Sequence, residues 1–269
     1  MTPTDYISVN GAIVAPTTSL DTFERLRAGY VRQDMRVRDR RPLHVAAHLA
    51  LLGRAFERVY GRRVVLSPAM VAAWCADLLV RNRYPSGGSC RVSALLIPSE
   101  RGADLVLVGG EILLDEGYSV RPVRPSASVD CYDVGFGEMP TSAAFEAAEA
   151  ALLRARNRHK VQGSHVVLRT DDEGVTLSAG TAPLFAVEGH TIITTPLAYG
   201  APDTIERQLT LDAIARSEIA LREDVVVADA LDRYDELFFA DYRGLTSIDR
   251  IGQTNYMSLV VDRIVRSMR

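Results

Sequence analysis

The sequence predicts an α+β protein of two domains, and three observations support this prediction. The chain has 269 residues, of which 47% are hydrophobic, so it can bury one large core or two smaller ones. Segments with the apolar spacing of helices occur among β-branched runs of strand length. Residues 119–128 are rich in proline and small polar residues and are predicted to be an interdomain linker. We therefore expect an N-terminal α+β domain at 1–118 and a C-terminal α/β domain at 129–269.

The first domain is predicted to alternate hairpins and helices. Its first hairpin turns at Asn10 and Gly11, the dipeptide that favours a type I′ turn. A helix is expected after Ser67, because serine caps helices and Pro68 suits the first helical position. The predicted hairpins, helices and strands of this domain are, in chain order, 6–15, 20–30, 33–45, 45–60, 68–82, 90–99 and 103–114.

The second domain is predicted to begin with an alanine-rich helix and to continue with two hairpins. The first hairpin turns in the acidic segment 171–174, and the second turns at Glu188 and Gly189. A proline- and glycine-rich loop then leads into a helix, for which Asp203 or Thr204 can serve as the N-cap. The predicted helices and the last predicted strand are 141–159, 204–220, 224–227 and 258–267.

Composition and charge argue against several functional classes. The formal net charge is −3, which gives no electrostatic reason to expect nucleic-acid or membrane partners. Three cysteines without a CxxC pair favour reduced thiols and a cytoplasmic location. The N-terminus lacks the apolar segment of a signal peptide, and no apolar run approaches the ~20 residues that span a bilayer. His44 and His48 are four residues apart, but no third ligand lies near them, so we expect no metal site.

The stretch 170–207 reads TDDEGVTLSAGTAPLFAVEGHTIITTPLAYGAPDTIER. It resembles the class IV aminotransferases, the pyridoxal-phosphate (PLP) enzymes that include branched-chain and D-amino acid aminotransferases and aminodeoxychorismate lyase. Their pattern is an acidic turn with glycine, then V-x-E-x-x-x-x-N-x-F, then TP, then a loop that ends G-I-T-R on a helix. The residues that match this pattern are Gly174, Thr176, Phe185, Thr195, Pro196, Ile205 and Arg207.

Two further segments extend the resemblance over nearly the whole chain. DELFFADYRGLTSI at 235–248 is similar to the family's D-E-V-F-L-T-G-T-A-x-x-V-T-P-V. RPLHVAAHLALL at 41–52 is similar to G-R-P-F-x-L-x-x-H-L-x-R-L, with His48 on the family histidine. The resemblance implies the two-domain fold of the D-amino acid aminotransferase-like PLP enzymes. It also implies a homodimer and a small-molecule site in the cleft between the domains.

Members of the family hold PLP as a Schiff base on a lysine, which only a primary amine can form. The family's K-T/S-x-N-Y motif aligns with Thr141 or Ser142 for its hydroxyl, so the lysine column falls at Pro140 or Met139. The chain's single lysine, Lys160, lies about twenty residues farther along. We interpret Lys160 as a helix-end cation that offsets the dipole, with a catalytic role as the minor alternative.

The other cofactor positions that the resemblance identifies are also substituted. Ser178 takes the place of the glutamate that pairs with the pyridine nitrogen. In the phosphate-binding set, Leu51 replaces an arginine, the Ile-Thr pair becomes Ile205-Glu206, and Tyr242 replaces a threonine. Arg54, one helical turn after Leu51, is a partial substitute for the missing arginine or a surface residue.

Two arginines are candidate substrate-binding residues. Family members often place arginines on the first-domain strands to bind a substrate carboxylate, and Arg36 and Arg91 lie on predicted strands there. Both are also compatible with surface ion pairs. No G-x-S-x-G, P-loop or Rossmann fingerprint occurs in the sequence.

Three functional hypotheses follow. The preferred one is a class IV aminotransferase-like protein that has lost PLP-dependent catalysis and persists as a small-molecule-binding or partner-binding pseudoenzyme, with no cofactor expected. The alternative is an active PLP-dependent aminotransferase or lyase that acts on an amino acid or an amino-chorismate-type substrate. The third is a pure interaction module.

Overall fold

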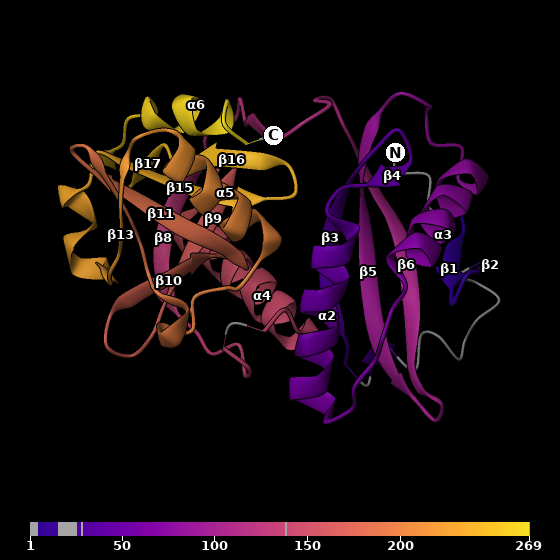
Figure 1. The fold of residues 1–269 in the computed structure, drawn as a ribbon. Coiled ribbons are helices and arrows are strands. Elements are labelled where there is room, and N and C mark those ends of the chain that lie inside the picture. The colour runs from indigo at the N-terminus through magenta and orange to yellow at the C-terminus, as the bar shows by residue number, and fades with distance from the viewer. Residues whose placement is uncertain (1–4, 16–25, 28, 138, 269) are drawn as a thin grey trace. The chain divides into compact units, whose positions relative to one another are not determined.

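The computed structural model describes residues 5–15, 26–27, 29–137 and 139–268 (Figure 1). The chain divides into two compact units. Unit 1 comprises Met1–Gly117 and Pro140–Ser142, and unit 2 comprises Tyr118–Met139 and Ala143–Arg269. The helix predicted at 20–30 falls largely outside the described residues.

Unit 1 contains a six-stranded antiparallel sheet in the order β2-β1-β6-β5-β3-β4. The first hairpin turns at Asn10 (φ 49°) and Gly11 (φ 88°), the positive angles that a type I′ turn needs, so this prediction is confirmed. The strands are β1 (Ile7–Val9), β2 (Ala12–Val14), β3 (Val31–Arg38), β4 (Arg41–Pro42), β5 (Ser89–Ser99) and β6 (Gly102–Leu113).

Helices α2 (Val45–Tyr60) and α3 (Pro68–Arg81) pack on this sheet. Helix α2 ends at Gly61, whose φ of 67° gives the left-handed C-cap that glycine adopts at least cost. Helix α3 begins after the Ser67 cap, as predicted. Leu52 and Phe56 of α2 are fully buried, so the apolar face expected for this helix forms part of the core of unit 1.

Unit 2 is built on a strongly branched sheet of twelve strands (Figure 1). Its main path runs β18-β17-β8-β9-β10-β11-β15-β16-β7, and β12, β13 and β14 pair beside this path. The strands are β7 (Ser119–Val120), β8 (Ser126–Cys131), β9 (His165–Thr170), β10 (Val175–Ala179), β11 (Ala182–Glu188), β12 (Thr191–Thr194), β13 (Ala220–Glu223), β14 (Val226–Val227), β15 (Glu236–Asp241), β16 (Gly244–Ser247), β17 (Arg250–Ile251) and β18 (Thr254–Asn255).

The central strands of unit 2 are buried on both faces, which explains their nearly continuous apolar sequence. On β11, Leu184 and Ala186 join one core, whereas Phe185 and Val187 join the other. In the second core, Phe185 stacks on Phe238 of β15 with ring centroids 5.1 Å apart. The sheet is therefore a layer between two hydrophobic cores.

Unit 2 carries α4 (Ser142–His159), α5 (Ile205–Arg216), α6 (Val260–Val265) and the 3₁₀ turns η2 (Leu197–Tyr199) and η3 (Ala228–Arg233). Helix α5 is shorter than the predicted 204–220, because Ala220–Glu223 instead form β13, which pairs in parallel with β12. The predicted strand at 224–227 is observed only as β14, Val226–Val227, which pairs with β10. No helix within the described part of the chain combines the length and the apolar character needed to cross a bilayer.

The chain passes between the two units at more than one place, and the residues predicted to be a linker are part of a sheet. Residues 119–128, predicted to be a linker, contain β7 and the start of β8, and both strands pair inside unit 2. Residues 140–142 belong to unit 1, where Arg32 N donates to Pro140 O (2.8 Å) and Ser142 N donates to Tyr30 O (2.8 Å). The chain therefore returns briefly to unit 1 before α4 begins.

Candidate functional site

A buried polar region of unit 2 surrounds Ser178 on β10. Ser178 lies opposite Arg169 of β9 in the strand register, and both side chains are buried, with exposed fractions of 0% and 6%. Arg169 Nε donates to Ser178 Oγ at 3.3 Å, and Ser178 Oγ donates to the Gly180 carbonyl at 2.8 Å. The position that the resemblance assigns to a carboxylate is thus a hydroxyl held against a guanidinium.

Arg169 has no carboxylate within ion-pair distance among the described residues. Its NH2 group donates to the Gly200 carbonyl at 2.7 Å, in the loop that follows η2. Burial lowers the pKa of the Arg169 guanidinium, while Tyr132, Asp133 and Asp171 oppose this effect from a greater distance. Arginine nevertheless keeps its charge in proteins, so the surroundings of Ser178 are cationic.

A β-bulge sets this geometry. The pairing of β10 with β9 shifts by one residue between Thr176 and Ser178, which aligns Ser178 rather than Leu177 with Arg169. Thr195 Oγ1 donates to the Thr176 carbonyl at 2.7 Å and so ties β10 to the loop that leads to α5. The buried Thr176 hydroxyl has no hydrogen-bond partner within the described residues.

Side chains of α5 and of its N-cap residue interact with the N-terminus of this helix. Thr204 Oγ1 caps the helix by accepting from Arg207 N at 3.0 Å. Glu206 lies buried in the first turn, where its negative charge offsets the helix dipole. The buried Arg207 donates to Glu223 at 2.8 Å. Helix α5 therefore begins at Ile205 with the carboxylate of Glu206 already in its first turn. This negative charge disfavours a phosphate there.

Tyr242 lies in the turn between β15 and β16. The guanidinium carbon of Arg243 lies over the Tyr242 ring, 5.3 Å from the ring centroid. Arg243 also forms an ion pair with Asp241. The family resemblance assigns a small threonine to the position of this aromatic residue.

The segment that the resemblance aligns with the family lysine, around Pro140, forms main-chain hydrogen bonds with residues 30–32. Pro140 and Ser142 bond to the N-terminal end of β3, and Thr141 bridges to Val31. Lys160 is exposed and directly follows the end of α4, with a left-handed φ of 49°. No primary amine other than Lys160 exists among the side chains of this chain.

In unit 1, the structure brings the two predicted substrate arginines together. Arg36 of β3 and Arg91 of β5 form a directly opposed pair. Arg36 is only 1% exposed and donates to the Asp115 carbonyl, while the Arg91 side chain lies against Gly110, where a Cβ atom would collide with it. Like charges directly opposed across strands destabilise a sheet, so this pair is unusual for a purely structural position.

The family histidine position, His48, is buried on α2. Its Nδ1 lies 3.0 Å from Gln33 Oε1, and burial, with a smaller effect of His44, lowers its pKa to about 3. Leu51 is in the core, whereas Arg54 is exposed. No group of three potential metal ligands occurs among the described side chains.

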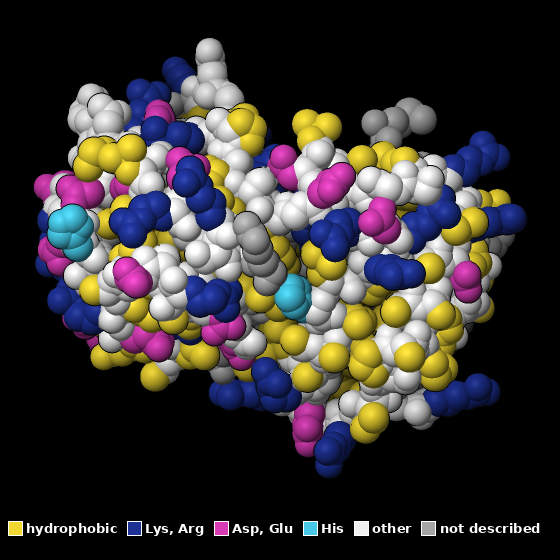
Figure 2. Space-filling view, turned by 45° about the horizontal axis from the view of Figure 1, so that its top comes forward, with side chains coloured by type: hydrophobic (Ala, Val, Ile, Leu, Met, Phe, Trp, Pro, Cys, Tyr) yellow, Lys and Arg dark blue, Asp and Glu magenta, His cyan; other side chains and the backbone are white. Residues whose placement is uncertain are grey.

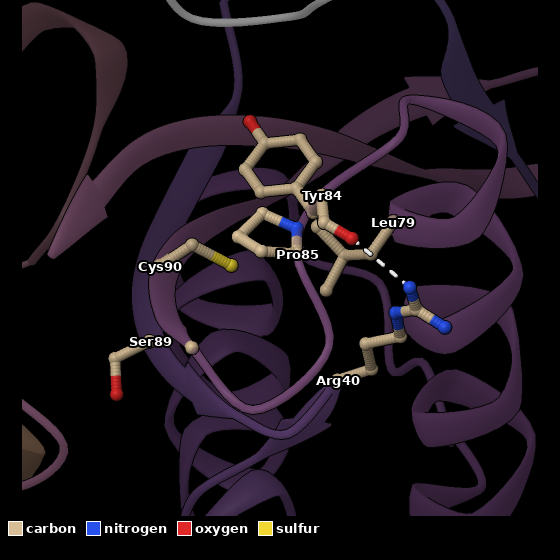
Figure 3. Close-up of a pocket in the computed structure, with 7 residues that line it drawn as sticks. Arg40, Leu79, Tyr84, Pro85, Ser89 and Cys90 are labelled. Carbon is tan, nitrogen blue, oxygen red and sulfur yellow. Dashed lines mark hydrogen bonds between the residues drawn. The ribbon is translucent and has the colours of Figure 1, made fainter.

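A small pocket in unit 1 has room for about one water molecule (Figure 3). Arg40 NH2 donates to the Tyr84 carbonyl at its edge, at 3.0 Å. Burial raises the pKa of Cys90, which lines the pocket, to about 12, so the thiol stays protonated.

On the face shown in Figure 2, basic and acidic side chains are interspersed.

Comparison with solved structures identifies the fold. The chain is similar to a branched-chain aminotransferase from Thermoproteus uzoniensis determined with norvaline, with a TM-score of 0.81, 16% identity, and coverage of 99% of this chain and 94% of that one. It is also similar to the Escherichia coli branched-chain amino acid aminotransferase, with a TM-score of 0.78, 18% identity, and coverage of 97% and 92%. The PLP form of the Thermobaculum terrenum enzyme gives a TM-score of 0.80, 14% identity, and coverage of 100% and 94%.

No family model and no curated protein matches the sequence. The structural likeness nevertheless shows that the chain has the two-domain fold of the fold-type IV, or class IV, PLP aminotransferases, as the sequence predicts. The prediction of an α+β protein with this fold is confirmed.

The described residues do not fit PLP as the resemblance would bind it. The lysine column is a paired main-chain segment, and the ring-nitrogen position is a serine beside an arginine. The helix that would bind phosphate begins with a buried glutamate. The sequence analysis did not identify Arg169, which the hairpin turning at 171–174 places next to β10.

Proposed function

We propose that this protein is a PLP-aminotransferase-fold pseudoenzyme that has lost covalent PLP catalysis and binds a small molecule. One observation carries the proposal: the only lysine, Lys160, is an exposed residue at the end of α4. A Schiff-base lysine must present its amine inside a site that excludes water. The position of Lys160 supports a structural role, because cations near a helix C-terminus offset the dipole.

The surroundings of Ser178 support the same conclusion independently. A PLP ring that stays protonated at its pyridine nitrogen needs a negative partner, and aminotransferases use a carboxylate for it. The Arg169–Ser178 pair offers a positive charge and a hydroxyl that is already donating to Gly180. A pyridinium placed there is repelled, so the ring would lose its function as an electron sink.

The test is incubation of the purified protein with PLP. We expect no internal aldimine band near ~410 nm, and no PLP retained after borohydride reduction and denaturation. The matched control is Lys160→Ala, which should give the same spectrum as the wild type. An aldimine band in the wild type that is absent from Lys160→Ala would refute the proposal.

The second candidate function is an active PLP-dependent aminotransferase or lyase. The observation that favours it is the near-complete overlap with branched-chain aminotransferases, one of them in its PLP form. It requires Lys160 to form the aldimine and Arg36 and Arg91 to bind a substrate carboxylate. Amino-group transfer from branched-chain amino acids to 2-oxoglutarate, lost in Lys160→Ala, would establish this function.

The proposal extends to assembly and location. We expect a homodimer, as the family resemblance implies, and a cytoplasmic protein, consistent with its three free cysteines. Light scattering after size-exclusion chromatography checks the first expectation, and fractionation of the cells that produce the protein checks the second.

A further inference from the structure

We infer that unit 2 binds an anionic small molecule, a carboxylate or phosphate compound, through the buried guanidinium of Arg169 beside Ser178. The inference deepens the proposed function, since it names the chemical class of the bound molecule. These residues do not suit a pyridinium, because the position that would need a negative side chain carries Ser178, which lies beside the positively charged Arg169.

The first argument is the missing counter-charge. Among the described residues of unit 2, two arginines are more than nine-tenths buried, Arg169 and Arg207. Arg207 has an ion pair with Glu223 at 2.8 Å, whereas Arg169 has only the Ser178 hydroxyl and the Gly200 carbonyl among the described residues. A buried charge is unfavourable unless it is paired. An anionic ligand supplies the pairing that the protein itself does not.

The second argument is the hydrogen-bonding capacity that remains near β10. Arg169 uses Nε and NH2, and no bond of its NH1 is found within the described residues. The hydroxyl of Thr176, two residues before Ser178, is fully buried and has no partner there either. A carboxylate or phosphate accepts from several such donors at once, and arginine binds both in bidentate geometry.

The third argument is that hydrogen bonds to the loop after β12 hold both Arg169 and the main chain of Thr176 in place. Arg169 holds the loop at Gly200, and Thr195 at the other end of that loop bonds to the main chain of Thr176. The guanidinium is thus fixed by a strand on one side and a loop on the other. Such fixed donors bind an anion with less loss of side-chain entropy than mobile surface arginines do.

The experiment titrates sodium phosphate or sodium acetate into the full-length protein at constant ionic strength. Calorimetry measures the affinity, and the thermal midpoint of unfolding is followed in parallel. We expect at least one of the two anions to bind and to raise the midpoint, and the one that binds distinguishes a phosphate from a carboxylate ligand. If neither anion binds at millimolar concentration, the inference is wrong.

Two variants locate the site. Arg169→Gln keeps a hydrogen-bonding side chain but removes the charge, and should weaken anion binding about tenfold or more. Arg124→Gln is the matched control, because Arg124 also donates to carbonyls in unit 2, at Ile248 and Tyr256, but lies 3.7 Å from Asp249. Anion binding that survives unchanged in Arg169→Gln overturns the inference.

A third variant remains informative if Arg169→Gln does not fold. Ser178→Asp places a carboxylate beside the guanidinium and should replace the ligand as its counter-charge. We expect this variant to have a higher thermal midpoint without anion and to respond less to the added anion. A lower midpoint together with an undiminished anion response contradicts the inference. The PLP spectrum tests the proposed function separately, since aldimine formation at Lys160 and anion binding at Arg169 can succeed or fail independently.

Discussion

Arg169 and Ser178 lie opposite each other on β9 and β10, and the arginine donates to the serine hydroxyl over 3.3 Å within the buried interior of unit 2. The contact places a positive charge beside Ser178, the position that the family resemblance assigns to the negatively charged partner of the PLP ring nitrogen. This positive charge motivates both the pseudoenzyme proposal and the anion site.

The first prediction concerns Lys160. Its φ of 49° lies in the left-handed region, which glycine adopts without the steric cost that other residues incur. Lys160→Gly should therefore leave the free energy of unfolding unchanged or raise it by up to about 1 kcal/mol. Urea unfolding measures this, with Lys160→Ala as the control that retains a Cβ. A clear loss of stability in Lys160→Gly would mean that the amine itself makes an important contact.

The second prediction concerns the start of α5. Thr204 Oγ1 accepts from Arg207 N at 3.0 Å, so Thr204→Ala should destabilise the protein by about 0.5–2 kcal/mol in urea unfolding. Thr204→Ser keeps the hydroxyl and should retain most of the stability. Equal stability of the wild type and Thr204→Ala would show that the cap contributes nothing.

The third prediction concerns the close approach of two strands in unit 1. A Cβ at Gly110 collides with the Arg91 side chain, so Gly110→Ala should lower the free energy of unfolding by about 1–3 kcal/mol. Gly117→Ala is the matched control, because nothing lies within 4 Å of its added Cβ and its φ is not positive. Combining Gly110→Ala with Arg91→Ala should recover part of the loss, and a purely additive double mutant would argue against the steric explanation.

The fourth prediction concerns pH. Burial lowers the pKa of His48 from 6.5 to about 3, so the unfolded chain binds a proton at this residue at a higher pH than the folded chain does. The stability from neutral His48 is therefore complete above pH 6.5 and is lost as the pH falls from 6.5 towards 3. The loss has an upper limit of about 1.4 kcal/mol per pH unit.

Urea unfolding between pH 7 and pH 4.5 measures this slope. His48→Gln should reduce it, whereas the exposed His190→Gln should leave it unchanged. An unaltered slope in His48→Gln would show that other groups cause the acid sensitivity.

Local signals predicted the elements that are stabilised by local interactions. The hairpin at Asn10-Gly11, helix α2 at Val45–Tyr60 and the start of α3 after Ser67 all match the prediction. The end of α5 does not match, because residues 220–223 gain main-chain hydrogen bonds from β12 that local propensity does not report. Local propensity likewise does not report β7 and β8 at residues 119–131, because the partners of these strands lie far along the chain.

The sequence alone determined that only one primary amine is present in the side chains, because residue identity needs no coordinates, and it predicted Ser178 at the position of a family glutamate. Tertiary structure alone decided what surrounds Ser178. A regular ladder continuing from the Thr170–Thr176 pair would bring Arg169 opposite Leu177, but the bulge in β10 moves it opposite Ser178. A shift of one residue in strand register changes which side chains lie opposite each other. The register depends on packing and hydrogen bonding across the whole sheet as well as on the residues of the hairpin.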